Sequence, residues 1–361
     1  MSDRAGVGII GAGVISTQYL RTLALAPDVD VRFVADLDVE RARARAAEFD
    51  VPASGSPAAL LADDDVRIVV NLTVPRAHVD VALAALAAGR HVWNEKPLAL
   101  DRASGRAVLD AARAAGLRVA TAPDTVLGPG FQRALRLVRS GAIGTPLSAL
   151  AQLQNPGPES WHPDPAFLYG DGAGPLFDLG PYYLTALVHL LGPVDRVQAV
   201  ATRAREERVI GSGPLAGQRF PVTVATQVSA LYTFTGGTSA QALFSFDSPL
   251  RRQRLEITGT EASVVVGDPN KFDSPPEVHH ADGSVLRTAP IRTKVGRGAG
   301  VVELARAIRA GEPERACGEV AYHVLDVMIA TIEAAESGGP VAVESTATAP
   351  APLPEGWDPL A

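Results

Sequence analysis

The sequence predicts an α/β protein with two domains. The first is expected to hold a doubly wound parallel sheet, and the second a largely antiparallel, open mixed sheet with helices. Three observations support this. Short apolar runs alternate with helical patterns over the first 121 residues, several β-rich runs follow one another after residue 147, and 361 residues exceed the size of one ordinary core.

The first third of the chain alternates strands and helices. The expected strands are residues 6–10, 31–35, 68–72, 91–94 and 117–121. The expected helices are residues 15–25, 40–49, 76–88 and 101–115, and the last two are followed by Gly89 and Gly116. Helices of this length between strands form right-handed crossovers, so the strands are expected to run parallel.

The pattern changes beyond Gly141. The expected strands there are residues 147–153, 194–204, 222–234, 239–247, 255–257 and 264–266. The expected helices are residues 181–191, 301–310 and 320–337. Strands that follow each other without helices favour a mixed or antiparallel sheet. The expected domains are residues 1–125 and 126–345, followed by a tail, 346–361.

Composition excludes several functional classes. The net charge is −7 and no basic block is present, which disfavours nucleic-acid and anionic-membrane binding. Cys317 is the only cysteine, so no internal disulfide is possible, and a reducing cytoplasmic location is expected. No apolar run reaches the roughly 18 residues of a membrane span. No residues show convincing metal-ligand spacing, and we expect no metal site.

A glycine-rich turn follows the first expected strand. Gly11 and Gly13 occupy the first two glycine positions of a G-x-G-x-x-G pattern, and Ser16 stands in the third. This pattern is typical of turns that place a pyrophosphate at a helix N-terminus, and Val14 and Ile15 beside it are expected to contact the cofactor. A glycine-rich turn that binds nothing is the alternative.

The end of the second expected strand bears on the choice of cofactor. Asp36 stands where an acidic side chain accepts hydrogen bonds from the adenosine ribose and repels a 2′-phosphate, and Leu37 offers no group to bind one. The sequence therefore favours NAD over NADP. Arg41 lies on the next helix and is interpreted as a solvated arginine, although it could reach a phosphate.

Further candidate cofactor-binding residues follow the next strands, at the edge where open α/β sheets bind ligands. Thr73, Pro75 and His78 follow one strand, and Glu95 and Lys96 follow the next. A lysine at this position can donate to a carbonyl oxygen and exchange a proton with an alcohol. The alternative is a surface lysine paired with Glu95.

These motifs, taken together, resemble the glucose–fructose oxidoreductase/inositol dehydrogenase (Gfo/Idh/MocA) family. The resemblance rests on residues 8–13, 88–98, 141–144 and 174–180 and extends from residue 6 to about residue 343. It implies an N-terminal Rossmann domain, a C-terminal α/β domain, bound NAD(P), and oxidation or reduction of a secondary alcohol on a sugar, cyclitol or related polyol. Lys96 matches the catalytic lysine of the family.

The chain departs from the family pattern after Asp178. Many relatives carry a histidine four residues later as the general acid/base, and here that position holds Tyr182. Either Tyr182 exchanges the proton, or it shapes the pocket and leaves the proton to Lys96 and Asp178, or it is a core residue. An aspartate common three residues later in relatives is replaced by Thr185.

The long loop over residues 154–174 holds candidates for substrate contact. Trp161 and Tyr169 could stack on a sugar ring, and His162 is a second candidate to replace the family histidine. Tyr183 and Asp124 are further substrate candidates. Aromatic residues that only anchor the loop, or that form a subunit contact, are the alternative.

The predicted function is therefore an NAD-dependent dehydrogenase or reductase acting on a sugar or polyol hydroxyl. One alternative keeps tightly bound NAD and uses transient oxidation for elimination, glycoside cleavage or epimerisation. A second is a dinucleotide-binding sensor without activity. A homodimer or homotetramer formed through the C-terminal sheet is expected.

Overall fold

The computed structural model describes residues 4–361 and divides into two compact units. Unit 1 contains the chain up to Gln132 together with residues 292–325 and 350–361. Unit 2 contains residues 133–291 and 326–349. The chain therefore returns to unit 1 twice, whereas the sequence placed residues 292–325 in the second domain and 350–361 in a separate tail.

Unit 1 is built on a six-stranded sheet in the order β3-β2-β1-β4-β5-β6, and all pairs are parallel. The strands are β1 (Ala5–Ile10), β2 (Val29–Ala35), β3 (Ala53–Gly55), β4 (Ile68–Asn71), β5 (His91–Asn94) and β6 (Val119–Thr121). The strand order reverses between β1 and β4, and open α/β sheets bind ligands beyond the carboxyl ends of the strands at such a point.

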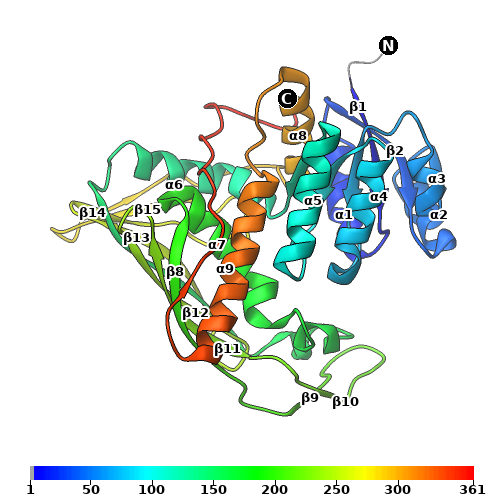
Figure 1. Ribbon diagram of the computed structural model, residues 1–361. Coiled ribbons are helices and arrows are strands. Elements are labelled where there is room, and N and C mark those ends of the chain that lie inside the picture. The colour runs from blue at the N-terminus through cyan, green and yellow to red at the C-terminus, as the bar shows by residue number, and fades with distance from the viewer. Residues whose placement is uncertain (1–3) are drawn as a thin grey trace. The chain divides into compact units, whose positions relative to one another are not determined.

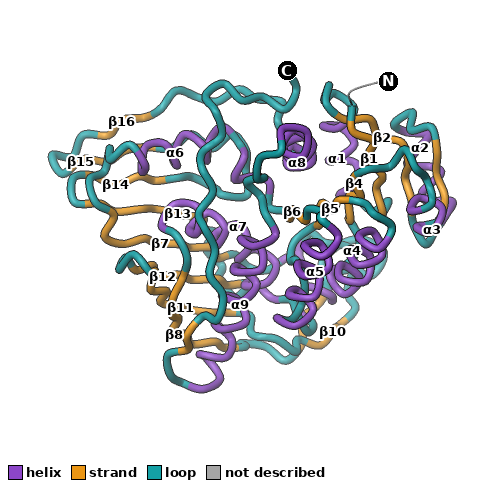
Figure 2. The backbone as a smooth tube through the Cα atoms, turned by 45° about the horizontal axis from the view of Figure 1, so that its top comes forward, coloured by secondary structure: helices purple, strands orange, loops and turns teal. Residues whose placement is uncertain are grey.

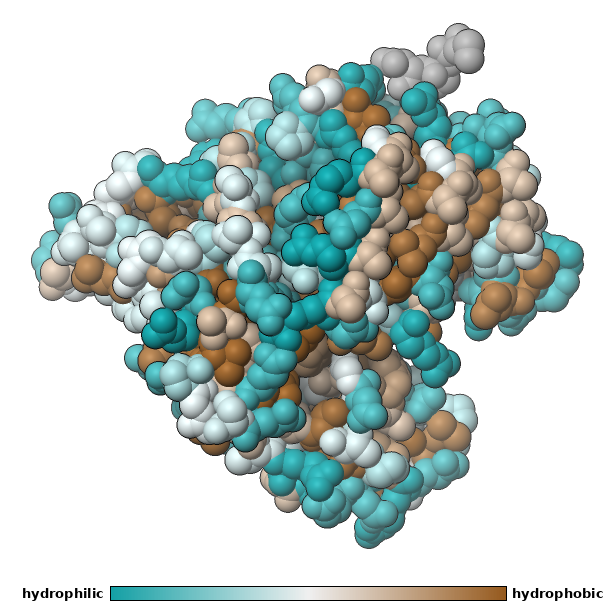
Figure 3. Space-filling view, in the orientation of Figure 1, coloured by the Kyte–Doolittle hydropathy of each residue, from teal (hydrophilic) through white to brown (hydrophobic). Residues whose placement is uncertain are grey.

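Helices cover both faces of this sheet (Figures 1 and 2). One face packs against α1 (Val14–Leu23), α2 (Val39–Glu48) and α8 (Ala299–Ala310). The other packs against α3 (Pro57–Leu61), α4 (His78–Ala87) and α5 (Arg102–Ala115). Figure 3 shows hydrophobic residues where α4 and α5 lie, in agreement with the half-buried apolar residues of α4. The predicted Rossmann architecture is confirmed.

Helix α8 explains why the chain returns to unit 1. At Gly300 any Cβ atom would collide with the ring of Trp93 on β5, so glycine allows the helix to pack directly on the sheet. Val301, Val302 and Leu304 of α8 are buried in the same core. This packing depends on contacts distant in sequence, which local patterns do not reveal.

Unit 2 is built on a nine-stranded sheet in the order β16-β15-β14-β13-β7-β12-β11-β8-β17. The strands are β7 (Pro146–Gln154), β8 (Val194–Thr202), β11 (Gln227–Phe234), β12 (Ser239–Ser245), β13 (Arg252–Gly259), β14 (Ala262–Val265), β15 (Glu277–His280), β16 (Val285–Arg287) and β17 (Val341–Ala342). Within this nine-stranded sheet, β7 with β12 is the only parallel pairing of described residues, and the other pairings are antiparallel. The predicted mixed, largely antiparallel sheet is therefore confirmed.

Helix α7 (Gly174–Leu191) packs against β7, β11 and β12. It begins seven residues before the predicted helix at residue 181 and includes Pro181 in its interior. The prediction was wrong because two Gly-Pro pairs lie in this stretch, and such pairs usually mark turns. The extension matters because it makes Asp178 and Tyr182 part of one helix.

Several short elements have no counterpart among the predictions. In unit 1 and at the unit boundary these are β3, α3, the 3-10 helix η1 (Pro75–Ala77), the 3-10 helix η2 (Asp124–Leu127) and α6 (Pro129–Arg139). In unit 2 they include the hairpin of β9 (Glu207–Val209) with β10 (Arg219–Pro221), the 3-10 helices η3 (Pro158–Ser160) and η4 (Ala166–Tyr169), and the edge strands β15, β16 and β17. Helix α9 (Gly318–Ser337) crosses the unit boundary.

No helix within residues 4–361 combines the length and hydrophobicity needed to cross a bilayer.

A buried arginine ties the long loop of unit 2 to the β9–β10 hairpin. The Arg208 guanidinium pairs with Glu159 of the loop and with Asp247, and it also donates to the carbonyl oxygens of Pro156 and Phe246. The side chain of Arg208 is almost wholly buried. One cation therefore pairs with two carboxylates and fixes the loop that carries the predicted substrate residues.

We predict that Arg208→Met lowers the free energy of unfolding by about 3–5 kcal/mol, because two partly buried carboxylates lose their shared cation. The control is Arg219→Met on the neighbouring strand, whose exposed pair with Glu207 is worth less than about 1 kcal/mol. Denaturant unfolding of both variants measures the difference. Equal losses would contradict the assigned role of Arg208.

Candidate functional site

The glycine-rich turn after β1 has the geometry of a ligand cradle. Gly11 has φ = +107°, and a Cβ there would lie 2.6 Å from the carbonyl oxygen of Leu72, so the position requires glycine. A Cβ at Gly13 would have no atom of the described chain within 4 Å. Gly13 also precedes the first turn of α1, where backbone N–H groups favour an anion.

The end of β2 contacts this turn through Asp36. Its carboxylate accepts hydrogen bonds from the Ala12 amide at 2.7 Å and the Asp38 amide at 3.0 Å, and it pairs with Arg41 at 2.6 Å. Burial raises the pKa of Asp36, but the bonds from Arg41 and the two amides outweigh it and hold the pKa below its usual value. Asp36 is therefore a carboxylate at neutral pH, fixed beside the turn.

Three apolar side chains around the same sheet edge are exposed. Val14, Leu37 and Val74 are 88%, 91% and 52% exposed, and they follow β1, β2 and β4. Ile15 and Pro75 beside them are half-buried. Solvent-facing aliphatic groups around an open glycine turn fit the flat rings and the pyrophosphate of a dinucleotide, so the residues present fit this cofactor.

A pair of buried amides joins the ends of β4 and β5. Asn71 and Asn94 are register partners in the sheet, and Nδ2 of Asn71 donates to Oδ1 of Asn94 at 2.6 Å. Oδ1 of Asn71 accepts from the backbone and hydroxyl of Thr73, and Nδ2 of Asn94 donates to the Glu95 carbonyl at 2.8 Å. The hydrogen bonds of this amide pair therefore fix the backbone of the two segments that follow β4 and β5.

The Glu95 side chain is held by aromatic residues of the core. Its Oε1 accepts from the Tyr19 hydroxyl at 2.8 Å, and Nε1 of Trp93 donates to that hydroxyl at 3.1 Å. Its Oε2 accepts from the Lys96 amide at 3.0 Å. Lys96 itself is half-buried, and the peptide bond from Lys96 to Pro97 is cis. The backbone of Lys96 is therefore fixed on its N-terminal side by the Glu95 carboxylate.

His78 occupies a buried position on the other side of this segment. Its Nδ1 lies 2.7 Å from the carbonyl oxygen of Pro97, and its Nε2 lies 3.0 Å from that of Thr73. Burial lowers the pKa of His78, and this effect outweighs the two carbonyl groups and the charge of Glu95, which raise the pKa; the charge of Lys96 adds a smaller lowering. Because both ring nitrogens face protein carbonyls, the structure favours an internal role for His78 over the predicted direct contact with cofactor.

Asp124 is also an internal residue. Its Oδ2 accepts from the amides of Gly298 and Gly300 at the start of α8, and its Oδ1 lies 3.5 Å from Arg297. Burial raises the pKa of Asp124, although Arg297 and the two amides oppose the shift. Full burial against α8 argues against the predicted contact of Asp124 with substrate.

In unit 2, Asp178 and Tyr182 lie four residues apart on α7. This spacing places their side chains on the same face of the helix, so the two predicted proton-transfer residues are neighbours. Tyr183 points differently. It is buried, packs edge-on against Phe244 of β12, and has a raised pKa caused first by burial and then by Asp268. This placement argues against contact of Tyr183 with substrate.

The long loop separates into an exposed and a buried part. Trp161 is 62% exposed, and the ring of His162 lies edge-on to Trp161 and to Phe167, which is 57% exposed. Tyr169 is fully buried and donates to Glu159. Trp161 and His162 are therefore accessible to a ligand, whereas Tyr169 anchors the loop.

Sequence reasoning missed Asn71, Asn94 and Tyr19. The two asparagines end adjacent strands, which could have indicated a cross-strand pair once the register was known. In the sequence, Tyr19 occupies an ordinary apolar position of α1. Only the structure shows that its hydroxyl donates a hydrogen bond to Glu95. No group of three or more His, Cys, Asp or Glu side chains in residues 4–361 is arranged to hold a metal ion.

Two family models match the chain. One is described as an oxidoreductase family with an NAD-binding Rossmann fold and matches residues 5–122. The other is described as the GFO/IDH/MocA C-terminal domain and matches residues 131–265.

Curated relatives include D-xylose 1-dehydrogenase (NADP(+)) 2 from Haloferax volcanii. It is 29% identical, and the match covers 93% of this chain and 99% of the relative. Levoglucosan dehydrogenase from Pseudarthrobacter phenanthrenivorans is 28% identical, with 72% of each protein covered.

Solved structures show the same fold. An oxidoreductase domain protein from Kribbella flavida has 25% identity and a TM-score of 0.83, with 95% of this chain and all of that chain covered. Levoglucosan dehydrogenase in complex with NADH and L-sorbose has 24% identity and a TM-score of 0.81 over the same shares.

Proposed function

Because the chain belongs to the Gfo/Idh/MocA family of NAD-binding oxidoreductases, we propose that it transfers a hydride between a nicotinamide and a secondary alcohol of a sugar, cyclitol or related polyol. One observation carries this proposal. Lys96 leaves β5 at the same sheet edge as the open glycine turn after β1, and it is fixed there by Glu95. The named relatives act on D-xylose and levoglucosan, which supports a sugar-like substrate.

Residues around the glycine turn would hold the cofactor. Gly11, Gly13 and the first turn of α1 would receive the pyrophosphate, and Asp36 would accept hydrogen bonds from the adenosine ribose. The flat rings of the dinucleotide would lie against Val14, Ile15, Thr73 and Pro75. The nicotinamide supplies the hydride chemistry when bound.

We further propose NAD as the preferred cofactor. The Asp36 carboxylate is ionised and fixed beside the turn, so it would repel a 2′-phosphate. Arg41 is half exposed, and its guanidinium is already paired with Asp36. A guanidinium that is paired with a carboxylate binds a phosphate more weakly than an unpaired guanidinium would.

Lys96 is the proposed proton-transferring residue. An ammonium or amine held by a fixed backbone can donate to a carbonyl oxygen during reduction and accept from a hydroxyl during oxidation. In unit 2, Asp178 and Tyr182 are proposed to take part in this proton transfer, and their shared helix face supports a joint role. Trp161 and His162 are proposed substrate contacts.

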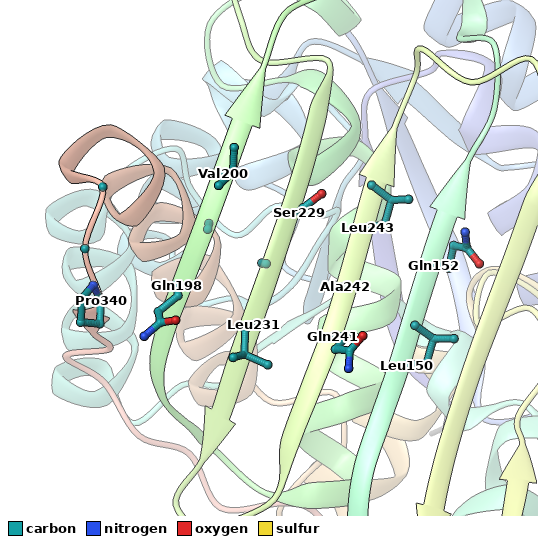
Figure 4. A pocket seen from close by; sticks show the side chains of 14 residues that line it. Leu150, Gln152, Gln198, Val200, Ser229, Leu231, Gln241, Ala242, Leu243 and Pro340 are labelled. Atoms are coloured by element: carbon teal, nitrogen blue, oxygen red, sulfur yellow. The ribbon is translucent and has the colours of Figure 1, made fainter.

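The exposed face of the unit 2 sheet is the proposed contact with a second copy of the chain. Strand β11 alternates exposed and buried residues, and the exposed side joins β7, β8 and β12 in an open depression of about 700 Å³. Figure 4 shows side chains of β7, β12, β11 and β8, which are neighbours in that order in the sheet. The residues that line it include Leu150, Gln152, Gln198, Val200, Ser229, Leu231, Gln241 and Leu243. None of its lining residues is charged, and uncharged surfaces of this kind favour self-association.

A screen of sugars, cyclitols and their keto forms, followed through NADH absorbance, tests the activity. Lys96→Met is expected to lower kcat by about 10²–10⁴-fold because the proton-transferring group is lost. The exposed Lys294 of the same unit provides the control, and Lys294→Met should retain activity. Full activity of Lys96→Met would contradict the proposal. Product formed without proportionate NADH would favour redox-neutral chemistry instead.

The cofactor preference is tested by fluorescence titration with NADH and NADPH. The wild-type protein should bind NADH at least about tenfold more tightly, a difference of about 1.4 kcal/mol. Asp36→Ala should reduce the preference for NADH over NADPH, whereas Glu40→Ala, at an exposed position on the neighbouring helix α2, should not. Tighter binding of NADPH by the wild-type protein would show that Asp36 has been misassigned.

Light scattering tests the self-association surface. The double variant Val200→Glu/Leu231→Glu should convert an oligomer into monomers, because charges at a contact core lose hydration without gaining partners. The control is Leu250→Glu, an exposed leucine that does not line the depression. A monomeric wild-type protein would rule the contact out.

A further inference from the structure

We infer that His78 is a positioning residue for Lys96 and acts through the carbonyl oxygen of Pro97. This inference rests on the proposed function for its kinetic consequences. It concerns only residues of unit 1, and its physical basis is the set of hydrogen bonds at the ends of β4 and β5.

The backbone of Lys96 is held from both sides. On the N-terminal side, the Glu95 amide donates to the Asn71 carbonyl at 2.9 Å, and the Lys96 amide donates to the Glu95 carboxylate at 3.0 Å. On the C-terminal side, the Pro97 carbonyl meets Nδ1 of His78 at 2.7 Å. Proline has no N–H to donate, so its carbonyl is the only backbone hydrogen-bonding group that Pro97 offers.

His78 also connects this segment to the loop after β4. It is the first residue of α4, its own carbonyl accepts from Nδ2 of Asn71 at 2.9 Å, and its Nε2 lies 3.0 Å from the Thr73 carbonyl. One buried ring therefore bridges the two segments that bear the predicted cofactor and proton-transfer residues, Thr73 and Lys96.

Of the two ring contacts, the one to Pro97 is the closer. A carbonyl oxygen only accepts, so Nδ1 must carry a proton to bond with Pro97. A neutral imidazole then has no proton left for Thr73, and only the protonated ring would satisfy both carbonyls. The shorter contact assigns the proton of the neutral ring to Nδ1, so in this assignment Nδ1 donates to Pro97, and this bond is the one that acts on Lys96.

Two substitutions separate the two bonds. The side-chain amide of asparagine places its nitrogen close to the position of Nδ1, and that of glutamine places its nitrogen close to Nε2. His78→Asn can therefore keep the bond to Pro97, whereas His78→Gln can keep only the bond to Thr73. His78→Ala removes both.

The kinetic expectation is a change in kcat without a change in binding. His78→Gln and His78→Ala should lose about 10–100-fold in kcat, because displacement of a reacting group by about 1 Å has effects of this size. The KM for sugar and the Kd for NADH should stay within about threefold, since the ring is buried and both its nitrogens face protein carbonyls. His78→Asn should recover most of the lost kcat.

The position of the Lys96 side chain can also be followed without an activity assay, because the chain has few lysines. Lys96, Lys271 and Lys294 are its three lysines. Reductive ¹³C-methylation therefore gives three side-chain signals, and Lys271 and Lys294 serve as internal references. The Lys96 signal should keep its wild-type position in His78→Asn and move in His78→Gln and His78→Ala.

Leu86→Ala provides the matched control for simple destabilisation. Leu86 is buried on the same helix as His78 but belongs to the apolar core, so its loss should weaken α4 without moving the Lys96 signal or lowering kcat. The unmutated protein offers a second check. Its ¹⁵N-histidine spectrum should show a proton on Nδ1 of His78, and an unprotonated Nδ1 would overturn the inference even if every variant failed to fold.

The outcomes separate this inference from the proposed function. If the Lys96 signal moves as expected but no sugar is turned over, the positioning role stands and the proposed function fails. If sugar is turned over but His78→Asn is as impaired as His78→Ala, or His78→Gln behaves like the wild-type protein, the positioning role fails and the proposed function stands.

Discussion

The hydrogen bond between the side-chain amides of Asn71 and Asn94 is the constraint on which the candidate site depends. The two residues are register partners at the carboxyl ends of β4 and β5, and both are buried. A buried amide that loses its partner is costly, so the two strand ends are held at a fixed separation. The segments that carry Thr73 and Lys96 begin directly after these two asparagines. The hydrogen bond between the asparagines therefore determines where both segments leave the sheet.

Around this pair the polar groups form hydrogen bonds with one another. Tyr19 and Trp93 hold Glu95, Glu95 holds the Lys96 amide, and His78 holds the Pro97 carbonyl. The neighbouring glycine turn is different, because the region beside Gly13 is open and the flanking aliphatic side chains are exposed. A hydrogen-bonded support next to an open cradle is the arrangement that preorganised catalysis requires.

Local patterns in the sequence were sufficient for the parallel sheet, whose predicted strands and helices in the first 121 residues have ends within two residues of those observed. They were also sufficient to locate the glycine turn, whereas the role of Lys96 stays a prediction. They failed where contacts between residues distant in sequence determine the structure. The examples are the packing of α8 in unit 1 and the start of α7, which continues through two Gly-Pro pairs. Chemical type alone also made His78, Asp124, Tyr169 and Tyr183 look like ligand contacts, although the fold buries them among protein partners.

The position of the Lys96 amine relative to a bound nicotinamide can be measured in a crystal structure of the protein with NAD. We expect the Lys96 ammonium to lie beside the nicotinamide ring, while the hydrogen bond between Asn71 and Asn94 and the contact of His78 with Pro97 stay intact. An ammonium directed into bulk solvent, remote from the ring, would contradict the proposed role of Lys96 and leave only the fold.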